Sequence, residues 1–508
     1  MHLEAYFSDD EFARFTRTRP YSQKILLLTV CRRWHDVAIS CPSFWRYVVV
    51  DTYESTERQL ELSREAPLNV YTTLSRRGQT ETEWGFSLVL EQIRRVQDLV
   101  VCAHGRRRVD HEPENLNLDA TAPILRSLSI HHFSNNHDNH ERNFVRKIGH
   151  GWDAPLLQHY ASHGGQEIFP WVDPNTHPAL RWKGTLTSFI WLPELDSRNI
   201  CPSSDALLEV LHQLPHLHTL QVAFSPTYSV QPVRPLAERT TISSAHLPGL
   251  RHLMLQGNLQ SCFDIIDHVA RPHTLSQFVI IAGHPLETPD ARETEALVDL
   301  LAERLVRDST NPPEPRVSAN LKLMRTLYIG PHELKNTSIE IMASSKLMNR
   351  TVSFPTRSQG AFRDIACDGQ YPDLDLCFVL PERILRTQFD TLLGGTILHK
   401  VEKLEVPGNP SDEASDWSIM NYYQPTKLSS EWSSKVFSLL DDIHTISVRD
   451  QIDPDLLLSY LSPSMPDPSH VQHNFPQLCL ARLRGVGLEG QPNRRRRMYI
   501  DCSTLPHR

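Results

Sequence analysis

Four histidines cluster in one polar segment and are the residues of this chain best suited to metal chemistry. The segment reads HHFSNNHDNHER, and its histidines are His131, His132, His137 and His140. Imidazole nitrogens bind zinc, and the neighbouring aspartate and glutamate offer carboxylate oxygens. The order of these residues matches neither zinc-helix pattern, HExxH or HxxEH, and the asparagines favour a loop. We therefore predict neither a metal site nor a bound cofactor.

One short segment matches a nucleotide-binding motif. The run Gly149–Ala154, GHGWDA, fits the dinucleotide fingerprint as text. That motif needs a buried strand before it and a helix after it. Residues 143–148 are too polar for such a strand, and Pro155 stands too close for the helix, so we interpret Ala154–Leu157 as a turn into a strand. Because no nucleophile elbow, phosphate loop or kinase signature is present either, the sequence indicates a protein that is not an enzyme.

Composition argues against two classes of partner. The 508 residues are 40% hydrophobic and 22% charged, which is typical of a folded chain with a large core. The formal net charge is -8, so no overall positive potential favours nucleic acid. No apolar run approaches the roughly 18 residues that a membrane span needs. We therefore expect protein partners, and neither nucleic acid nor a membrane.

The cysteines and the first residues indicate a cytoplasmic or nuclear protein. The nine cysteines are widely spaced, odd in number and without a CxxC pair, so reduced thiols are expected. The start, MHLEAYFSDDEF, has no basic stretch followed by an apolar one and is not a signal peptide. The run Arg494–Arg497 fits an import signal or an anion-binding patch as well as a solvated tail, and we favour the tail.

An apolar stripe characterises the first helix that the sequence predicts. Leu26, Val30, Trp34 and the pair Val37 and Ala38 recur at helical spacing, which predicts a helix of about four turns with one apolar face. An ordinary helix that covers a core gives the same spacing. The cysteine and proline that follow end the helix, since the residue before a proline disfavours helical geometry.

The residue types around this stripe resemble the second half of an F-box. The family pattern is roughly V-C-R-x-W-x-x-I-A-x-x-x-P-x-L-W, and the sequence from Val30 to Trp45 is VCRRWHDVAISCPSFW. Upstream, Tyr6–Lys24 is similar to the variable insert of F-box proteins from mushroom-forming fungi, the basidiomycetes. The resemblance implies a small helical module that binds the Skp adaptor of a cullin–RING ubiquitin ligase. The residues carried over as the adaptor contact or its immediate core are Leu27, Val30, Cys31, Trp34, Val37, Ala38, Pro42, Phe44 and Trp45.

One part of the family pattern is missing. The opening helix of an F-box, with its Leu-Pro-x-Glu-Ile/Leu start, has no counterpart before this stretch, and Met1 stands about where that helix should have ended. We expect either a start at a late methionine or an incomplete adaptor surface.

A second pattern, apolar-x-x-apolar-x-apolar, returns through the rest of the chain. Most of its copies follow one another at about 25 to 33 residues, near the length of a leucine-rich repeat. Each short strand would place alternate apolar side chains on one face, and each repeat must stack on the next to bury them. The copies are Val96/Leu99/Val101, Leu125/Leu128/Ile130, Leu156/His159/Ala161, Leu186/Phe189/Trp191, Leu217/Leu220/Val222, Leu250/Leu253/Leu255, Leu275/Phe278/Ile280, Met324/Leu327/Ile329, Leu374/Cys377/Val379, Val401/Leu404/Val406, Ile443/Ile446/Val448 and Phe475/Leu478/Leu480.

Helical patterns lie between many of these predicted strands. The expected helices are Ser55–Pro67, Ser204–Leu214, Ser261–Val269, Ala291–Val306, Pro381–Leu392, Glu431–Leu440 and Asp453–Leu461. Further short strands are expected at Val48–Val50, Asn69–Thr73 and Thr351–Phe354.

These patterns predict an α/β fold in three parts. A short all-α F-box-like module covers 1–50, a curved leucine-rich-repeat-like solenoid with a parallel sheet covers 51–490, and a basic tail covers 491–508. The repeats resemble the degenerate repeats of F-box proteins, which implies a substrate-recognition subunit of a Skp–cullin–F-box ubiquitin ligase. The alternative is a non-catalytic repeat scaffold whose degenerate F-box no longer binds the adaptor.

The strands also predict where a target protein binds. The middle side chain of each L-x-Φ segment, where Φ is apolar, faces away from the core, and the row of these side chains mixes polar and apolar groups. Residues that are merely solvated would show the same alternation. The predicted target-binding row is Ser129, Gln221, Met254, Val279, Tyr328, Glu405 and Ser447.

Overall fold

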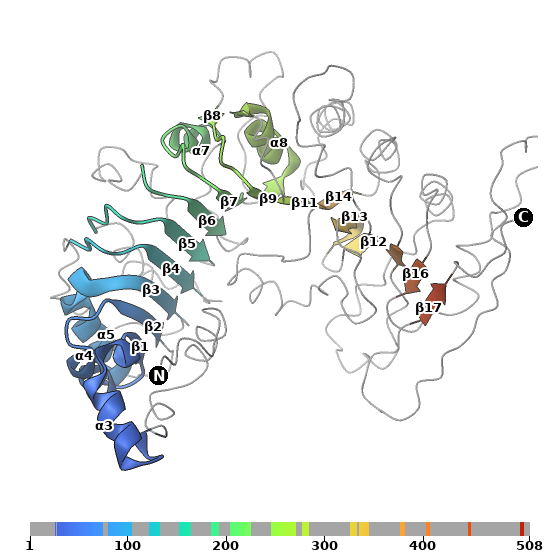
Figure 1. The fold of residues 1–508 in the computed structure, drawn as a ribbon. Helices are drawn as coiled ribbons and strands as arrows, with labels where there is room; N and C mark the ends of the chain where they lie inside the picture. Colours follow the sequence, from blue (N-terminus) through green and yellow to red (C-terminus); the bar gives the residue numbers. More distant parts are fainter. Residues whose placement is uncertain are drawn as a thin grey trace, which may run out of the picture. The chain divides into compact units, whose positions relative to one another are not determined.

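The computed structural model of the chain has mixed α/β content, and most of its paired strands run parallel to one another (Figure 1). The structure describes residues 26, 28–74, 80–103, 121–132, 152–163, 184–192, 204–224, 245–270, 277–283, 326–332, 335–344, 376–381, 403–406, 445–448 and 498–501. The chain divides into two compact units, one of residues 1–230 and 237–250 and the other of residues 231–236 and 251–508.

The first unit contains a parallel sheet whose described strands pair in the order of the sequence. Each strand lies beside the next one along the chain, from β1 to β7. The strands are β1 (Tyr47–Val50), β2 (Leu68–Leu74), β3 (Val96–Ala103), β4 (Ser127–His132), β5 (His159–His163), β6 (Ser188–Leu192) and β7 (Thr219–Ala223), and a two-residue strand, β8 (Ala245–His246), follows.

Two rows of side chains across this sheet form the core of the first unit. The strand register sets the members of each row opposite one another, and all fourteen are buried. Since each strand is short, it buries these two positions only by stacking beside its neighbours. The first row is Val48, Val70, Leu99, Leu128, Tyr160, Phe189 and Leu220, and the second is Val50, Thr72, Val101, Ile130, Ser162, Trp191 and Val222.

A proline turn leads the chain toward four of the strands. In each turn an apolar residue, a proline, any residue and a leucine follow one another, and the leucine amide donates to the carbonyl of the first residue at 3.1–3.2 Å. Proline fits the second position because its ring fixes the backbone angle that the turn requires. Both apolar positions are buried in all four turns, which are Ala122–Leu125, Ala154–Leu157, Leu214–Leu217 and Leu247–Leu250. The turn predicted at Ala154–Leu157 is therefore confirmed.

Helices accompany the sheet of the first unit. The helix α4 (Tyr53–Ser63) begins with a capping box, in which Thr52 and Ser55 exchange side-chain and backbone hydrogen bonds. It packs against α5 (Thr80–Glu91), which the sequence analysis did not predict and which precedes the 3-10 turn η3 (Ile93–Arg95). The helix α7 (Ser204–Leu211) lies within the expected range.

The second unit departs from a simple parallel order. The strand β9 (His252–Asn258) pairs in parallel with β11 (Gln277–Gly283), and β11 pairs in parallel with β14 (Leu376–Pro381). The hairpin of β12 (Thr326–His332) and β13 (Lys335–Ser344) comes next, with β13 antiparallel to both neighbours. The strands β15 (Lys403–Val406) and β16 (Thr445–Val448) continue in parallel from β12, and β17 (Met498–Asp501) closes antiparallel to β16. The remaining elements are α8 (Leu259–His268) and β10 (Val269–Ala270).

Most strand predictions that fall on described residues are confirmed, with three corrections. The predicted copy Leu156/His159/Ala161 is wrong by one residue, because Leu157, Tyr160 and Ser162 are the buried set. A one-residue shift moves every side chain of a strand to the other face. The expectation of parallel pairing throughout is wrong at β13 and β17, and β17 also places a strand inside the predicted tail. The first strand, β1, matches the strand expected at Val48–Val50 and begins one residue earlier.

Several predictions fall outside the residues that the structure describes. They are the strands at Thr351–Phe354 and Phe475/Leu478/Leu480 and the helices at Ala291–Val306, Pro381–Leu392, Glu431–Leu440 and Asp453–Leu461. The helices expected at Ser55–Pro67 and Ser261–Val269 match α4 and α8 in place, with shifted ends.

We predict that Gly85→Ala destabilises the first unit although alanine favours helices. A Cβ atom at Gly85 would lie 2.8 Å from Thr56 Oγ1 and 3.2 Å from the Thr52 carbonyl oxygen, so α4 and α5 would have to separate. Overpacking of this kind costs about 1–3 kcal/mol, against about 1 kcal/mol gained in helix propensity. Urea denaturation should show a net loss of about 1 kcal/mol. The control Ser87→Ala, on the same helix, should change stability by less than about 0.5 kcal/mol, and a Gly85→Ala variant as stable as wild type would contradict the packing argument.

Candidate protein-binding surfaces

The predicted N-terminal helix is interrupted. Leu26 belongs to an initial helical turn, and both the backbone amide and the hydroxyl of Thr29 donate to the Leu26 carbonyl, at 3.2 and 2.8 Å. Cys31 is extended, with φ -164° and ψ 163°, and α3 runs only from Arg32 to Ser40. The prediction of one continuous helix of four turns is therefore wrong. The β-branched Thr29 and Val30 favour helices weakly, and the threonine hydroxyl offers the Leu26 carbonyl another donor.

A buried tryptophan holds the end of this segment together. The 3-10 turn η2 (Pro42–Trp45) follows α3, and Trp45 is 0% exposed. Its indole Nε1 donates to the Ala38 carbonyl at 2.8 Å, and the Phe44 ring meets the indole edge-on at 5.2 Å between centroids. Because η2 also packs against α4, the tryptophan joins α3 to the first unit.

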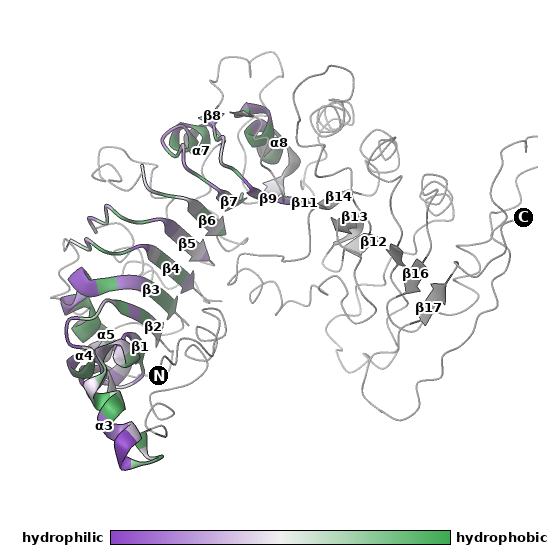
Figure 2. Cartoon of the chain, viewed as in Figure 1, coloured by the Kyte–Doolittle hydropathy of each residue, from purple (hydrophilic) through white to green (hydrophobic). Residues whose placement is uncertain are grey.

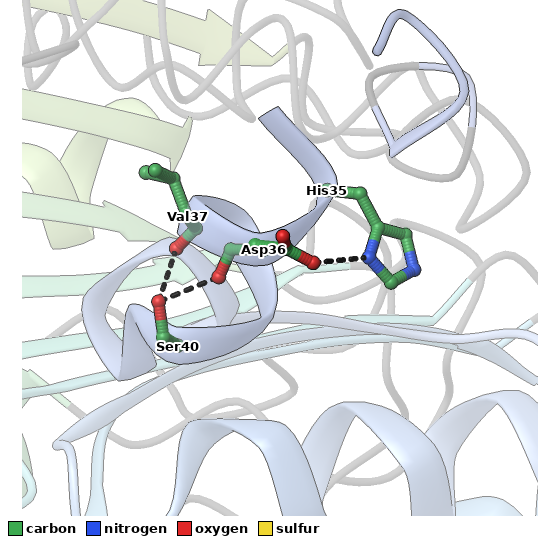
Figure 3. A network of polar contacts seen from close by, with 4 residues as sticks. All are labelled: His35, Asp36, Val37 and Ser40. Carbon is green, nitrogen blue, oxygen red and sulfur yellow. Dashed lines mark hydrogen bonds and ion pairs between the residues drawn. The ribbon is translucent and has the colours of Figure 1, made fainter. Parts of the chain in front are cut away.

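Polar groups complete the last turn of α3 (Figure 3). The Ser40 hydroxyl lies 2.6 Å from the Asp36 carbonyl oxygen and 3.1 Å from that of Val37, so it satisfies acceptors that a helix end leaves open. His35 Nδ1 and Asp36 Oδ1 lie 3.3 Å apart in solvent. The Val37 side chain projects away from both contacts (Figure 3).

Three large apolar side chains of this segment face solvent. Leu26 and Val30 are each 63% exposed and Val37 is 55% exposed, and Cys31 between them is exposed as well. Hydrophobic and hydrophilic residues alternate along this end of the chain (Figure 2). Solvent exposure of several apolar side chains on one short segment is characteristic of a protein-binding surface.

The structure thus separates the nine predicted adaptor residues into a core and a surface. Ala38 and Trp45 are buried, and Trp34, Pro42 and Phe44 are half-buried. Val30, Cys31 and Val37 are exposed, and Leu27 lies outside the described residues.

The predicted target-binding row is only partly accessible. Ser129 is half-buried on the face of the sheet opposite Leu128 and Ile130. Gln221, Met254 and Val279 are 4%, 7% and 1% exposed, so the prediction that they face solvent is wrong. The strands of Met254 and Val279, β9 and β11, carry the apolar runs Leu253–Leu255 and Phe278–Ile281, a pattern typical of parallel strands covered on both faces. Tyr328, Glu405 and Ser447 lie on β12, β15 and β16, and the structure does not describe their side chains.

A polar row crosses the sheet of the first unit on the same face as Ser129 and Gln221, two residues earlier in each strand. Its members lie directly opposite one another on seven consecutive strands, and each carries a hydrogen-bonding side chain. His159 is exposed and the other six are half-buried. The row is Tyr47, Asn69, Asp98, Ser127, His159, Ser188 and Thr219. This row was not predicted from the sequence, although each member stands one residue before a member of the first buried row.

Charge is concentrated at one end of this polar row. Burial raises the pKa of Asp98, and the positive charges of Arg126 and Arg46 oppose that rise. With its amide nitrogen turned toward the next strand, Asn69 donates to Asp98 Oδ2 at 3.1 Å. Arg46 donates to the Tyr47 hydroxyl at 2.6 Å. Two arginines around one carboxylate leave this end of the row positively charged.

Two buried histidines lie at the other end of the same strands. His131 and His163 stack with ring centroids 4.5 Å apart and planes 10° apart, and His131 Nε2 lies 2.8 Å from Ser129 Oγ. Burial and the neighbouring His131 lower the pKa of His163 to about 3, and both of its ring nitrogens lack a hydrogen-bond partner. A metal ion lies in the ring plane of each imidazole that binds it, so rings stacked this closely cannot share one ion. His137 and His140 of the histidine cluster lie outside the described residues.

Comparisons with known proteins leave these surfaces without a family. No protein-family model matches the sequence, and a search of curated proteins finds no match. In the part of the chain that the structure describes, no three His, Cys, Asp or Glu side chains are placed to hold a metal ion. The same described residues include no helix with the length and apolar character to cross a membrane.

We predict that His163 makes the protein less stable in acid. Below about pH 6.5 an unfolded chain protonates this histidine, whereas the folded chain does so only near pH 3, so stability falls as the pH drops through that window. At pH 5 the loss is about 2 kcal/mol relative to neutral pH. Urea denaturation of His163→Phe, which keeps a stacking ring, should lack this share of the pH dependence. The variant His216→Phe, at an exposed position, is the control, and an unchanged acid slope in His163→Phe would contradict the assignment.

Proposed function

We propose that this chain is the substrate-recognition subunit of a Skp–cullin–F-box ubiquitin ligase. The observation that carries the proposal is the arrangement around α3. An F-box-like sequence forms a helical segment with a tryptophan core, and its outer apolar residues Val30 and Val37 are 63% and 55% exposed. Burial of such side chains against an adaptor would remove apolar surface from water, at about 25 cal/mol per Å².

The sheet of the first unit supports the second half of the proposal. Parallel strands at steady spacing, of which β4 to β7 each follow a buried leucine, are what a degenerate leucine-rich-repeat solenoid would present. We propose that the polar row from Tyr47 to Thr219 contacts the target protein together with the half-buried row beside it, which is Val49, Tyr71, Val100, Ser129, Ala161 and Ile190. Hydroxyl, amide and imidazole groups can pair with backbone groups of a partner, and the apolar neighbours of these groups provide contact area.

In this proposal the chain itself catalyses nothing. It holds a target protein near the ubiquitin-transfer machinery and thereby raises the effective concentration of the target there. The partners are a Skp-type adaptor with its cullin–RING ligase and a target protein, in the cytoplasm or nucleus, without a cofactor.

A second candidate function follows from the break in the N-terminal helix. Thr29 to Cys31 leave the helical path, so Leu26 and α3 do not form one continuous surface. A repeat scaffold that binds a protein without contacting the adaptor is consistent with this break.

Adaptor binding separates the two functions. We expect the full chain to co-elute with purified Skp adaptor in size-exclusion chromatography, and Val37→Asp to weaken this binding at least tenfold, because a charge would be buried against an apolar partner. Since Val37 is 55% exposed, the substitution should leave the fold intact. Leu156→Asp, at a position that is 44% exposed in the same unit, is the matched control and should bind as wild type does.

Each result of this experiment is informative. If wild type fails to bind the adaptor, the ligase proposal is wrong and the scaffold remains. If wild type and Val37→Asp bind equally, the adaptor contact lies elsewhere than on α3.

A further inference from the structure

The helix α5 carries apolar residues on two opposite sides. Phe86 and Val89 face the core and are 1% and 0% exposed. Trp84 is 60% exposed, and Leu88 is half-buried one turn further along the same face. A surface helix ordinarily has one apolar face and one polar face, so the outer side of α5 is unusual.

Two glutamates border this outer apolar pair. Glu81, Trp84, Leu88 and Glu91 follow one another at steps of three, four and three residues, which places them along one face of the helix, and we call them the Trp84 face. Glu81 and Glu91 are exposed, and among the residues that the structure describes neither forms an ion pair. A single exposed apolar residue is common on protein surfaces, but an apolar pair between two uncompensated carboxylates is a more specific arrangement.

The neighbouring helix strengthens the negative charge. Together α4 and α5 contain six glutamates and one basic residue, Arg58, which pairs with Glu61 at 2.8 Å. A surface with this charge repels nucleic acid phosphates and anionic lipids and attracts Lys and Arg side chains. It is therefore complementary to a basic protein segment.

We propose that the Trp84 face docks a basic amphipathic helix of a partner protein. An apolar side chain of that helix packs on Trp84 and Leu88, and flanking Lys or Arg side chains pair with Glu81 and Glu91. A basic side chain that crosses the indole also gains a cation–π contact. The face extends over the eleven residues from Glu81 to Glu91, a rise of about 15 Å, which matches about three turns of a partner helix. This proposal is independent of adaptor binding at α3 and of the polar row on the sheet.

A designed peptide provides the test. The probe is a fluorescent helical peptide of leucine and lysine with one apolar stripe bordered by lysines, and fluorescence anisotropy reports its binding to the full chain. We expect Trp84→Ala and the double variant Glu81→Lys, Glu91→Lys each to weaken binding at least tenfold. The matched controls are Leu156→Ala, which removes another exposed apolar side chain of the same unit, and Glu209→Lys, which reverses an exposed charge on α7 away from α4 and α5, and both should bind nearly as wild type does.

Two further measurements make the result decisive. A second peptide with glutamate in place of every lysine should bind wild type at least tenfold more weakly. Circular dichroism should show Trp84→Ala to be folded, as its 60% exposure predicts. The proposal is overturned if the lysine peptide does not bind wild type, if it binds Trp84→Ala as tightly as wild type, or if both peptides bind equally.

Discussion

Cross-strand register is the constraint on which the first unit depends. No strand from β1 to β7 is longer than eight residues, and each contributes two side chains to the buried rows. A strand this short loses conformational freedom on folding without burying much surface by itself. The apolar surface becomes continuous and excludes water only when all seven strands place those two positions in line. The proline turns serve the same end, because each sets the buried leucine at a fixed distance before the strand. Trp45, which stands two residues before β1, is buried as well.

The alignment of the strands could be predicted from the sequence wherever large apolar residues occupy both buried rows. Leu128 with Ile130, and Phe189 with Trp191, are unambiguous, and those strands were predicted correctly. The strand β5 was predicted one residue out of register, because it buries Tyr160 and Ser162 and a pattern of aliphatic residues selects neither of them. The order of β14 and β12 was also beyond prediction, since the repeat pattern describes each strand alone and says nothing about a hairpin placed between them. The helix α5 was not predicted, because its apolar residues lie on both sides and do not form the single stripe that is typical of a surface helix.

The candidate sites show the same division. The F-box-like pattern led to Val30, Val37 and Trp45, but spacing alone could not separate exposed residues from buried ones. That separation comes from the extended backbone at Cys31 and from the hydrogen bond between Trp45 and Ala38. On the sheet, alternation predicted correctly that Ser129 and Gln221 face away from the aliphatic core. Whether side chains on that second face are exposed depends on what covers the face. The sequence of a strand indicates such cover only where consecutive residues are apolar, as in Phe278–Ile280.

The stacking of the strands also determines which positions can carry functional side chains without disturbing the fold. Every position in the two buried rows is committed to stability, and a polar or charged replacement there would leave an unpaired group in the core. What remains variable in the first unit is the polar row at the start of the strands, the outer sides of α4 and α5, and the exposed residues around α3. These three surfaces belong to different elements. Among the described residues, no side chain of one surface is paired by strand register with a side chain of another. In a chain built this way, side chains can change along the sheet while those on the helices stay the same, because the buried rows between them hold the fold constant.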